Sequence, residues 1–193
     1  MSSGFVFVGG NASTKRLIRV CRASASEELT FEDLEGAAAR RGFRISDRSA
    51  GPLLAFDAFA EDKRIGFSTG YVVPGLKRLH IEGMKVGQNA SKGGSLLDAN
   101  AAKILVLCLI VRAAEMQAAD IYGLAIKDEE EQHRRLSNYI QRMTGAVPVR
   151  EVGGSLKDAP DRVVWGGEGT IFRASVSELL RKWAPIIHRM ARR

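Results

Sequence analysis

The chain has 193 residues, 45% of them hydrophobic, so it can fold around one sizeable core, and it has no repeat or low-complexity tract of the kind found in fibrous or solenoid proteins. Its two cysteines, Cys21 and Cys108, cannot build a disulfide framework, which is typical of a reducing compartment. Because residues 1–26 hold four basic side chains and no acid, only +3 of the net charge of +7 falls on residues 27–193, which argues against nucleic-acid binding.

Residues 1–26 form a distinct segment, rich in serine and arginine, and ordinary globular sequence begins at Glu27. This composition resembles an organellar transit peptide. A secretory signal fits poorly, because the short apolar stretch from Phe5 to Val8 precedes the basic residues. A disordered cytosolic N-terminus is the alternative. We expect one globular domain over residues 27–173 and a C-terminal helix over residues 174–193 packed on it.

The first predicted elements are a helix and three strands. The helix runs from Leu29 to Arg41, with Thr30 as its N-cap, Asp33 three residues further on, and Gly42 as its stop. Apolar runs bounded by turn residues predict strands over Pro52–Ala60, Arg64–Val73 and Leu79–Val86.

A polar loop of small residues, from Val86 to Leu97, joins the third strand to a long apolar helix. Such a loop leaves backbone N–H groups free, and the first turn of the helix adds its own free donors and the positive end of its dipole. The loop therefore predicts a cradle for a phosphate or pyrophosphate group, with a plain connection as the alternative. Its candidate binding residues are Gln88, Asn89, Ser91, Lys92, Gly93 and Gly94.

The helix after this loop begins near Ser95 and carries an unbroken apolar run from Ile104 to Val111. The run is about half the length that a bilayer span requires, and Lys103 and Arg112 bracket it. We therefore predict a buried helix and no membrane span, with Cys108 filling core volume.

The second half of the chain alternates in the same way. A buried strand is expected over Asp120–Ile126, and a helix over Asp128–Met143, ended by Gly145. The acidic first turn of that helix precedes basic residues, so Glu130–Arg134 and Glu131–Arg135 can pair. Two further strands are expected over Val147–Val152 and Asp161–Trp165, with the glycine-rich stretch after them as the connection to the terminal helix.

Hairpin turns and helical crossovers both join the expected strands, which predicts an α/β fold: a mixed twisted sheet flanked by helices. The order of strand, Gln-x-x-Ser-x-Gly-Gly loop, long apolar helix, strand and helix resembles the GNAT (N-acetyltransferase) superfamily over roughly residues 29–155. In that family such a loop holds the pyrophosphate of coenzyme A. Gln88 matches its first position and Gly93 its last, and Ser91 stands where the family usually has glycine. The resemblance implies a GNAT-like acyl-CoA acyltransferase fold.

A more specific resemblance, to a plant and algal plastid branch of GNAT-like proteins, is carried by Leu124–Asp128, Gln132–Leu136 and Val164–Thr170. Together with residues 1–26, it implies a transit peptide and a location in the chloroplast (plastid stroma). The mitochondrion and the cytoplasm are the alternatives.

The resemblance also implies roles on the third strand. Gly83 would mark a bulge, and Met84 and Val86 would offer backbone groups to the pantetheine arm and thioester. Glu82 would act as general base, directly or through water, and a solvent-facing or salt-bridged carboxylate is the alternative. His80 shares the strand face of Glu82 by the period of two, and we expect a structural role for it, with assistance to Glu82 as the alternative.

The family's general-acid tyrosine has no direct counterpart here. In many members it lies four residues before the glycine that ends the helix, and that position is Gln141, or Ile140 if Thr144 is counted as an insertion. Neither side chain can protonate a thiolate, which leaves the adjacent Tyr139 as the candidate acid, or water in its place. No metal is expected, because His133 has no second His or Cys at ligand spacing.

These residues predict an acyl-CoA-dependent N-acyltransferase that moves an acetyl group from acetyl-CoA to an amine of a protein or small molecule. Gln88, Gly93 and Glu82 favour this interpretation. The alternative is a catalytically weak binding or assembly module in an organelle, acting through the basic terminal helix with Trp183. The absent tyrosine and Ser91 favour that alternative.

Overall fold

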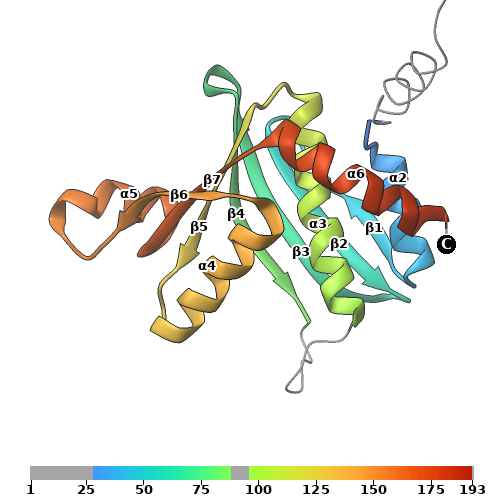
Figure 1. The fold of residues 1–193 in the computed structure, drawn as a ribbon, viewed down its shortest axis with the longest axis horizontal. Helices are drawn as coiled ribbons and strands as arrows, with labels where there is room; N and C mark the ends of the chain where they lie inside the picture. The colour runs from blue at the N-terminus through green and yellow to red at the C-terminus, as the bar shows by residue number, and fades with distance from the viewer. Residues whose placement is uncertain (1–27, 88–95, 193) are drawn as a thin grey trace, which may run out of the picture.

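The computed structural model describes residues 28–87 and 96–192, which form a seven-stranded sheet flanked by helices (Figure 1). In chain order the elements are α2 (Phe31–Arg40), β1 (Arg44–Asp47), β2 (Leu53–Ala60), β3 (Lys63–Val73), η1 (Pro74–Leu76), β4 (Arg78–Val86), α3 (Leu96–Glu115), β5 (Asp120–Ile126), α4 (Glu130–Thr144), β6 (Val147–Val152), η2 (Leu156–Asp158), α5 (Ala159–Trp165), β7 (Gly169–Ser175) and α6 (Val176–Arg192).

The strands lie in the order β1-β2-β3-β4-β5-β7-β6. Neighbouring strands are antiparallel except β4 and β5, which are parallel and are joined by the crossover helix α3. Parallel neighbours require such a crossover, because a tight turn can join only antiparallel strands. The predicted mixed sheet is confirmed.

The two faces of β3 have different surroundings. Buried residues alternate along this strand with partly exposed ones. On the buried side, which we call the inner face, the Ser68 hydroxyl donates a hydrogen bond of 3.0 Å to the carbonyl of Leu105 in α3. The opposite side, which we call the outer face, carries Phe67, Thr69 and Tyr71.

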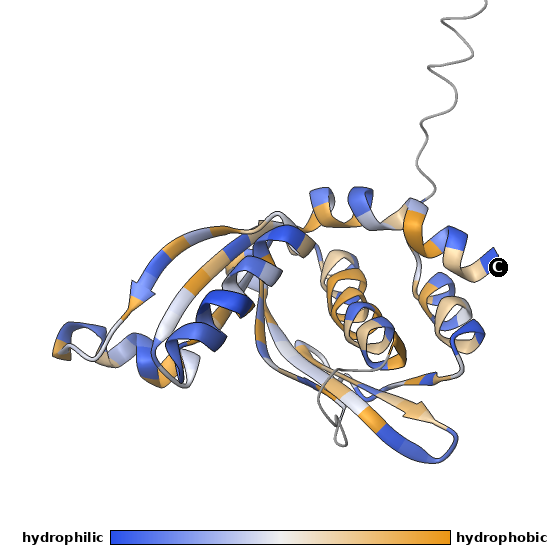
Figure 2. Ribbon diagram, turned by 60° about the horizontal axis from the view of Figure 1, so that its bottom comes forward, coloured by the Kyte–Doolittle hydropathy of each residue, from blue (hydrophilic) through white to orange (hydrophobic). Residues whose placement is uncertain are grey.

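The core lies between the inner face and helices α2, α3 and α6, with the apolar α3 at its centre (Figure 2). Phe56 and Leu79 from the sheet meet Leu109 from α3 and Ile187 from α6, and all four are fully buried. Cys108 is also buried there, and burial raises the pKa of its thiol far above the usual range, so the thiol stays protonated and unreactive. The predicted core role of Cys108 is confirmed.

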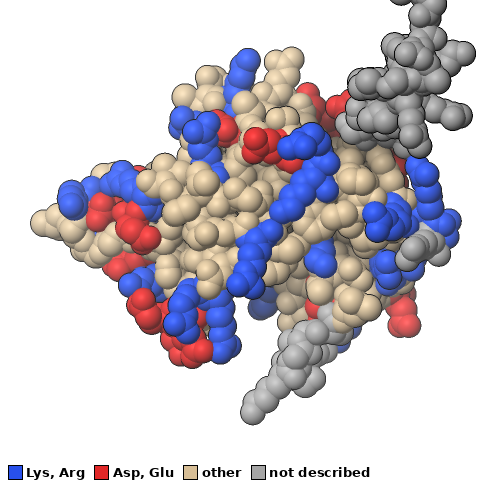
Figure 3. All heavy atoms as spheres, in the orientation of Figure 1, with Lys and Arg blue, Asp and Glu red and all other residues tan. Residues whose placement is uncertain are grey.

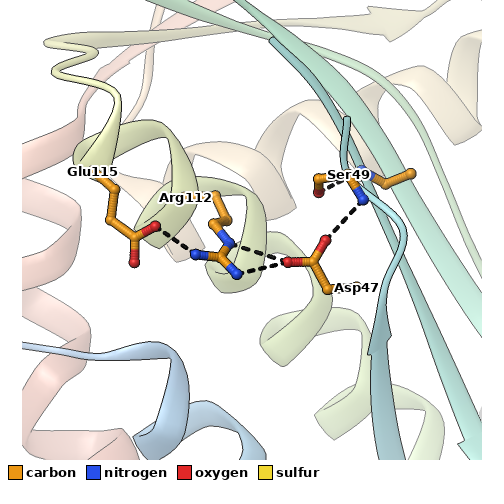
Figure 4. A network of polar contacts seen from close by, with 5 residues as sticks. Asp47, Ser49, Arg112 and Glu115 are labelled. Carbon is orange, nitrogen blue, oxygen red and sulfur yellow. Dashed lines mark hydrogen bonds and ion pairs between the residues drawn. The ribbon is translucent and has the colours of Figure 1, made fainter. Parts of the chain in front are cut away.

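Arg112, in the last turn of α3, ties that helix to β1 (Figure 4). Its guanidinium donates to one carboxylate oxygen of Asp47 at 2.8 and 3.1 Å and to Glu115 at 2.7 Å, and the backbone N–H of Ser49 donates to the other oxygen of Asp47 at 2.8 Å. Burial by itself would raise the pKa of Asp47. The hydrogen bonds from Ser49 and Arg112 together outweigh burial and lower that pKa.

The N-terminal end of α2 is as predicted. The Thr30 hydroxyl accepts a hydrogen bond from the backbone N–H of Asp33, whose carboxylate in turn accepts one from the N–H of Thr30, which makes a capping box. The helix ends at Arg40, and Gly42 follows with a φ of +81°, a conformation that glycine adopts without strain.

One predicted strand is wrong. Residues 161–165 belong to the helix α5, which has Pro160 in its first turn and ends at Gly166 in the left-handed conformation. Val163 and Val164 suggested a strand by their β-branched side chains, but they are 84% and 59% exposed on this short helix. The last strand is β7, so the glycine-rich stretch after Trp165 leads into a strand and not into the terminal helix.

The strand β1 was not predicted, because its four residues show no clear alternation of buried and exposed positions. In α4, the predicted stop at Gly145 and the ion pair between Glu131 and Arg135 are confirmed. Glu130 pairs with Lys127 at 3.1 Å instead of with Arg134.

Two predictions concern parts of the chain outside the described residues: the transit-peptide-like segment 1–26 and the anion-binding loop with Gln88, Asn89, Ser91, Lys92, Gly93 and Gly94. The predicted C-terminal helix is α6, whose buried residues belong to the main core. Within residues 28–87 and 96–192, no helix combines the length and apolarity needed to cross a bilayer.

Candidate active site

The sheet splits between β4 and β5. The two strands pair only where Arg78–Ile81 lies opposite Asp120–Gly123, and Figure 1 shows them diverging. Beyond that point Gly83–Val86 pairs only with β3, and Leu124–Ile126 only with β7. Two strand edges therefore face the split with backbone groups that have no strand partner in the described sheet.

A bulge in β4 lies where the split begins. Ile81 pairs with Gly70 and Gly83 pairs with Thr69, so Glu82 is an extra residue with no counterpart on β3. The bulge predicted at Gly83 is confirmed. Because of the extra residue, Glu82 and Gly83 both face the outer side of the sheet.

An apolar pocket lies on the inner side of the split. Its walls come from β4, α3, α4 and α6, and they include Met84, Lys103, Val106, Tyr139, Met143 and Trp183. Met84 pairs with the buried Ser68 and so points to the inner face. Lys103 brings a positive charge to this mainly apolar lining.

Tyr139 lies in this pocket and is 45% exposed. Its partial burial raises the pKa of the phenol, so the hydroxyl keeps its proton at neutral pH and can donate it. Successive residues of a helix point about 100° apart, so the expected acid position at Gln141 or Ile140 does not show where the side chain of Tyr139 lies.

None of the residues of α4 is fully buried, and hydrogen bonds hold the helix to the sheet at its start and to α6 at its end. Near the start, His133 contacts the carbonyl of Ile126 at 3.3 Å and the hydroxyl of Thr170 at 3.0 Å. At the end, Lys182 and Trp183 of α6 donate to the carbonyl of Met143 at 2.9 and 3.2 Å. The wall that carries Tyr139 is thus positioned by these polar contacts together with apolar packing of α4.

The face with α3, α4 and α6 is basic. Figure 3 shows Lys and Arg side chains across the middle of this face. Arg142 in the last turn of α4 and Arg181 and Lys182 of α6 are exposed. A concentration of positive charge beside the pocket favours a ligand with phosphate groups.

The outer side of the split carries an exposed carboxylate. Glu82 is exposed, and the described residues offer it no salt bridge, so the salt-bridged alternative is not observed there. The structure therefore places Glu82 and Tyr139 on opposite sides of β4, with Met84 on the Tyr139 side. Val86 packs against the core.

Three residues near the split were not predicted in their observed positions. Lys103 was interpreted only as the boundary of an apolar run, and Trp183 only as part of the terminal helix in the alternative binding module. Trp165 was placed on a strand, but at the end of α5 its ring stacks on His80 with 4.8 Å between ring centroids. For Lys103, the one sequence signal that could have indicated a ligand was its positive charge at the edge of an apolar run.

In the described part of the chain, no group of three or more His, Cys, Asp or Glu side chains is arranged to hold a metal ion.

The arrangement of the chain is similar to that of solved acetyltransferases. A Bacillus subtilis acetyltransferase in complex with CoA aligns with a TM-score of 0.48 and 14% identity, over 69% of this chain and 98% of that one. An aminoglycoside 6'-acetyltransferase type Ii aligns with a TM-score of 0.48 and 15% identity, over 65% and 70%. A GNAT-family acetyltransferase from Staphylococcus aureus Mu50 aligns with a TM-score of 0.46 and 12% identity, over 65% and 68%.

No protein-family model and no curated protein sequence matches the chain. The structural likeness is remote, so it assigns neither a substrate nor a catalytic residue to this protein.

Proposed function

We propose that this protein is an acyl-CoA-dependent N-acyltransferase of the GNAT type, which transfers an acetyl group from acetyl-CoA to an amine. The observation that carries the proposal is the split between β4 and β5, which starts at a bulge and has an apolar pocket on one side and the exposed Glu82 on the other. Direct transfer needs room for a thioester arm, access for the amine, a base for the amine proton and a proton for the departing thiolate.

The edges of the split suit the pantetheine arm of coenzyme A. Along a strand, alternate residues direct their N–H and C=O groups to the same edge, and those of Glu82–Val86 that face β5 have no strand partner in the described sheet. Pantetheine is an extended chain with amide groups, so it can pair with this edge as an added strand would. Met84 and Val86 are the proposed backbone partners.

The side chains divide the proton transfers between the two sides of the sheet. Bound acyl-CoA would supply the thioester and leave as the free thiol. On the outer side, Glu82 takes the proton of the amine nitrogen as that nitrogen bonds to the acyl carbon. On the inner side, the protonated phenol of Tyr139 donates to the departing sulfur. Lys103 and the basic face favour the phosphates of the coenzyme.

Thermal unfolding with acetyl-CoA tests this proposal. A ligand at about 100 times its dissociation constant stabilises a protein by about 2.7 kcal/mol, so we expect a clear rise in Tm. Lys103→Glu should weaken binding by about tenfold, since one favourable charge contact is lost. Lys157→Glu, on the distant η2, is the matched control and should bind like the wild type. The absence of both a Tm shift and binding heat for the wild type would overturn the proposal.

We also propose that the protein acts in an organelle, with the plastid stroma as the first candidate. The serine- and arginine-rich, acid-free composition of residues 1–26 supports this location. Mass spectrometry of the native N-terminus tests it. A start close to Ala23–Ser26 is expected, whereas a start at Met1 or Ser2 would exclude import with cleavage.

A further inference from the structure

Three rings from adjacent strands meet on the outer face, beside the bulge. Tyr71 of β3, His80 of β4 and Tyr122 of β5 are direct neighbours in the sheet register. The centroid of the His80 ring lies 5.0 Å from that of Tyr71 and 5.9 Å from that of Tyr122. Trp165 stacks on the same imidazole, with centroids 4.8 Å apart and planes inclined by 10°. Aromatic contacts therefore fix the position of the imidazole.

Among residues 28–87 and 96–192, only one nitrogen of the His80 imidazole has a hydrogen-bond partner. Nδ1 lies 3.2 Å from the Tyr71 hydroxyl, and the described residues provide no hydrogen-bond partner for Nε2. Burial and the nearby Arg78 lower the pKa of His80, so the ring is neutral at pH 7. When Nδ1 carries the proton and donates to Tyr71, Nε2 offers a lone pair to a ligand.

This open nitrogen lies close to the proposed base. His80 and Glu82 are two residues apart on the outer side of one strand, which corresponds to about 7 Å. That separation allows one amine nitrogen to lie between the imidazole and the carboxylate, within reach of both.

The segment that carries Trp165 is held by contacts of its own. Arg150 pairs with Asp158 at 3.0 Å and with Asp161 at 2.7 Å, and Arg162 donates to the carbonyl of Gly153 at 3.2 Å. The neighbouring Val164 is 59% exposed, so α5 is not docked on the sheet through its valines. The stack on His80 is therefore a specific contact of Trp165 and not a result of general burial.

The charges around the rings limit the ligand. Arg173 and Asp120 neutralise each other through two hydrogen bonds of 3.0 Å. Arg78 lies over the Tyr122 ring, 4.9 Å from its centroid, and adds a positive charge. Glu82 thus provides one carboxylate that can pair with a ligand, beside the apolar surface that the aromatic rings form. If a molecule with several ammonium groups bound here, one of them could pair with Glu82. Its other positive charges would lie against the aromatic rings and the positively charged Arg78, which is unfavourable.

We propose that His80 binds the acceptor of the transferase through Nε2, with Tyr71 and Trp165 as positioning residues, and that the acceptor is a primary amine with a single positive charge and an apolar body. This inference rests on the proposed function. The ammonium first loses one proton to solvent, and Nε2 accepts a hydrogen bond from one N–H of the neutral amine. The nitrogen then attacks the acyl carbon, Glu82 takes the proton that the nitrogen loses, and the sulfur of coenzyme A leaves with the proton from Tyr139.

Steady-state kinetics with acetyl-CoA and two probe amines test the inference. We expect kcat/KM to be at least about tenfold higher for 2-phenylethylamine than for spermidine, because spermidine carries charges that the site cannot pair. His80→Gln should raise the KM for 2-phenylethylamine by about tenfold, the effect of one lost hydrogen bond, without changing the Kd for acetyl-CoA. His188→Gln, on α6, is the matched control and should leave both constants unchanged.

The positioning residues need their own readouts. Tyr71→Phe removes only the hydroxyl, and we expect it to raise the KM of the amine while kcat changes less. Trp165→Leu should do the same, and Trp165→Phe, which keeps a ring on His80, should restore most of the loss. In nitrogen NMR spectra of the protein bound to coenzyme A, added 2-phenylethylamine should shift the Nε2 signal of His80.

The outcomes separate the inference from the proposed function. If the protein neither binds acetyl-CoA nor acetylates any amine, both fail together. If it acetylates amines but His80→Gln keeps the amine KM within about twofold, or spermidine is the better acceptor, the transferase stands and the inference is overturned. An Nε2 signal that stays unchanged at a saturating amine concentration would also overturn it.

Discussion

Glu82 belongs to β4 and points to its outer side, whereas Tyr139 lies beside the inner side of this strand, and this separation gives each a distinct task in the proposed reaction. The exposed Glu82 lies on the outer side, where an amine can approach it. Tyr139 is partly buried, and burial raises its pKa and keeps it protonated. A base and an acid held apart in this way do not exchange a proton directly with each other.

Replacing Glu82 tests the first of these tasks. Glu82→Gln should lower kcat by about 100-fold or more, the usual effect of losing a general base, while the Kd for acetyl-CoA stays as in the wild type. Steady-state kinetics and calorimetry measure the two quantities. Glu32→Gln, on the exposed side of α2, controls for the loss of a carboxylate. Full turnover in Glu82→Gln would remove Glu82 from the role of base.

Gly169 is the residue where the fold itself depends on the absence of a side chain. It has a φ of +154°, and a Cβ there would lie 2.0 Å from the carbonyl oxygen of Ala125 in β5. Gly169→Ala should therefore lower the free energy of unfolding by about 3 kcal/mol or more. Urea unfolding measures the change. Gly75→Ala, where a Cβ meets nothing within 4 Å, should change stability by less than about 1 kcal/mol.

Among the elements, α3 contributes most to the core, because most of its residues from Ile104 onward are buried against the sheet, α2 and α6. Leu109→Ala at the fully buried position should cost about 2–5 kcal/mol of unfolding free energy. Leu96→Ala, at the 73% exposed start of the same helix, should cost less than about 0.5 kcal/mol. Equal effects in denaturant melts would contradict the assignment of α3 as the central core helix.

The contact between β1 and α3 predicts a pH effect. The pKa of Asp47 in the folded protein is below its usual value, so its ionisation stabilises the fold above pH 3.8, and this contribution is lost as the pH falls through the lowered pKa. Asp47→Asn should destabilise the protein by about 1 kcal/mol at pH 6, and the difference should shrink below pH 4. Asp62→Asn, in the turn between β2 and β3, is the control. A difference that stays constant down to pH 3 would contradict the assignment.

For the whole molecule, much of the fold could be predicted because most elements carry strong local signals. The capping pair Thr30 and Asp33, the apolar run of α3 and the glycine after α4 all follow from short-range chemistry. The position of the last strand could not be predicted from such local signals. Val163 and Val164 favour a strand locally, and only the pairing of β7 with β5 and β6 shows where the last strand lies.

For the candidate site, too, features with a local sequence signal could be predicted, and features that depend on contacts between distant segments could not. The bulge was predictable, since a glycine within a strand is a local signal, whereas the role of Glu82 was implied by the family resemblance and stays a prediction. The direction of Tyr139, the lining by Lys103 and Trp183, and the stack of Trp165 on His80 depend on packing between distant segments. No short sequence pattern encodes such contacts.

The central claim is that coenzyme A lies in the split between β4 and β5. A crystal structure of the protein with a non-reactive acetyl-CoA thioether tests it most directly. We predict that the pantetheine arm runs between the two strands, pairs with the backbone of Met84 and Val86, and brings its sulfur toward Tyr139, with the acetyl group accessible from the side of Glu82. A coenzyme bound elsewhere, or a split that closes by direct pairing of β4 with β5, would contradict the claim.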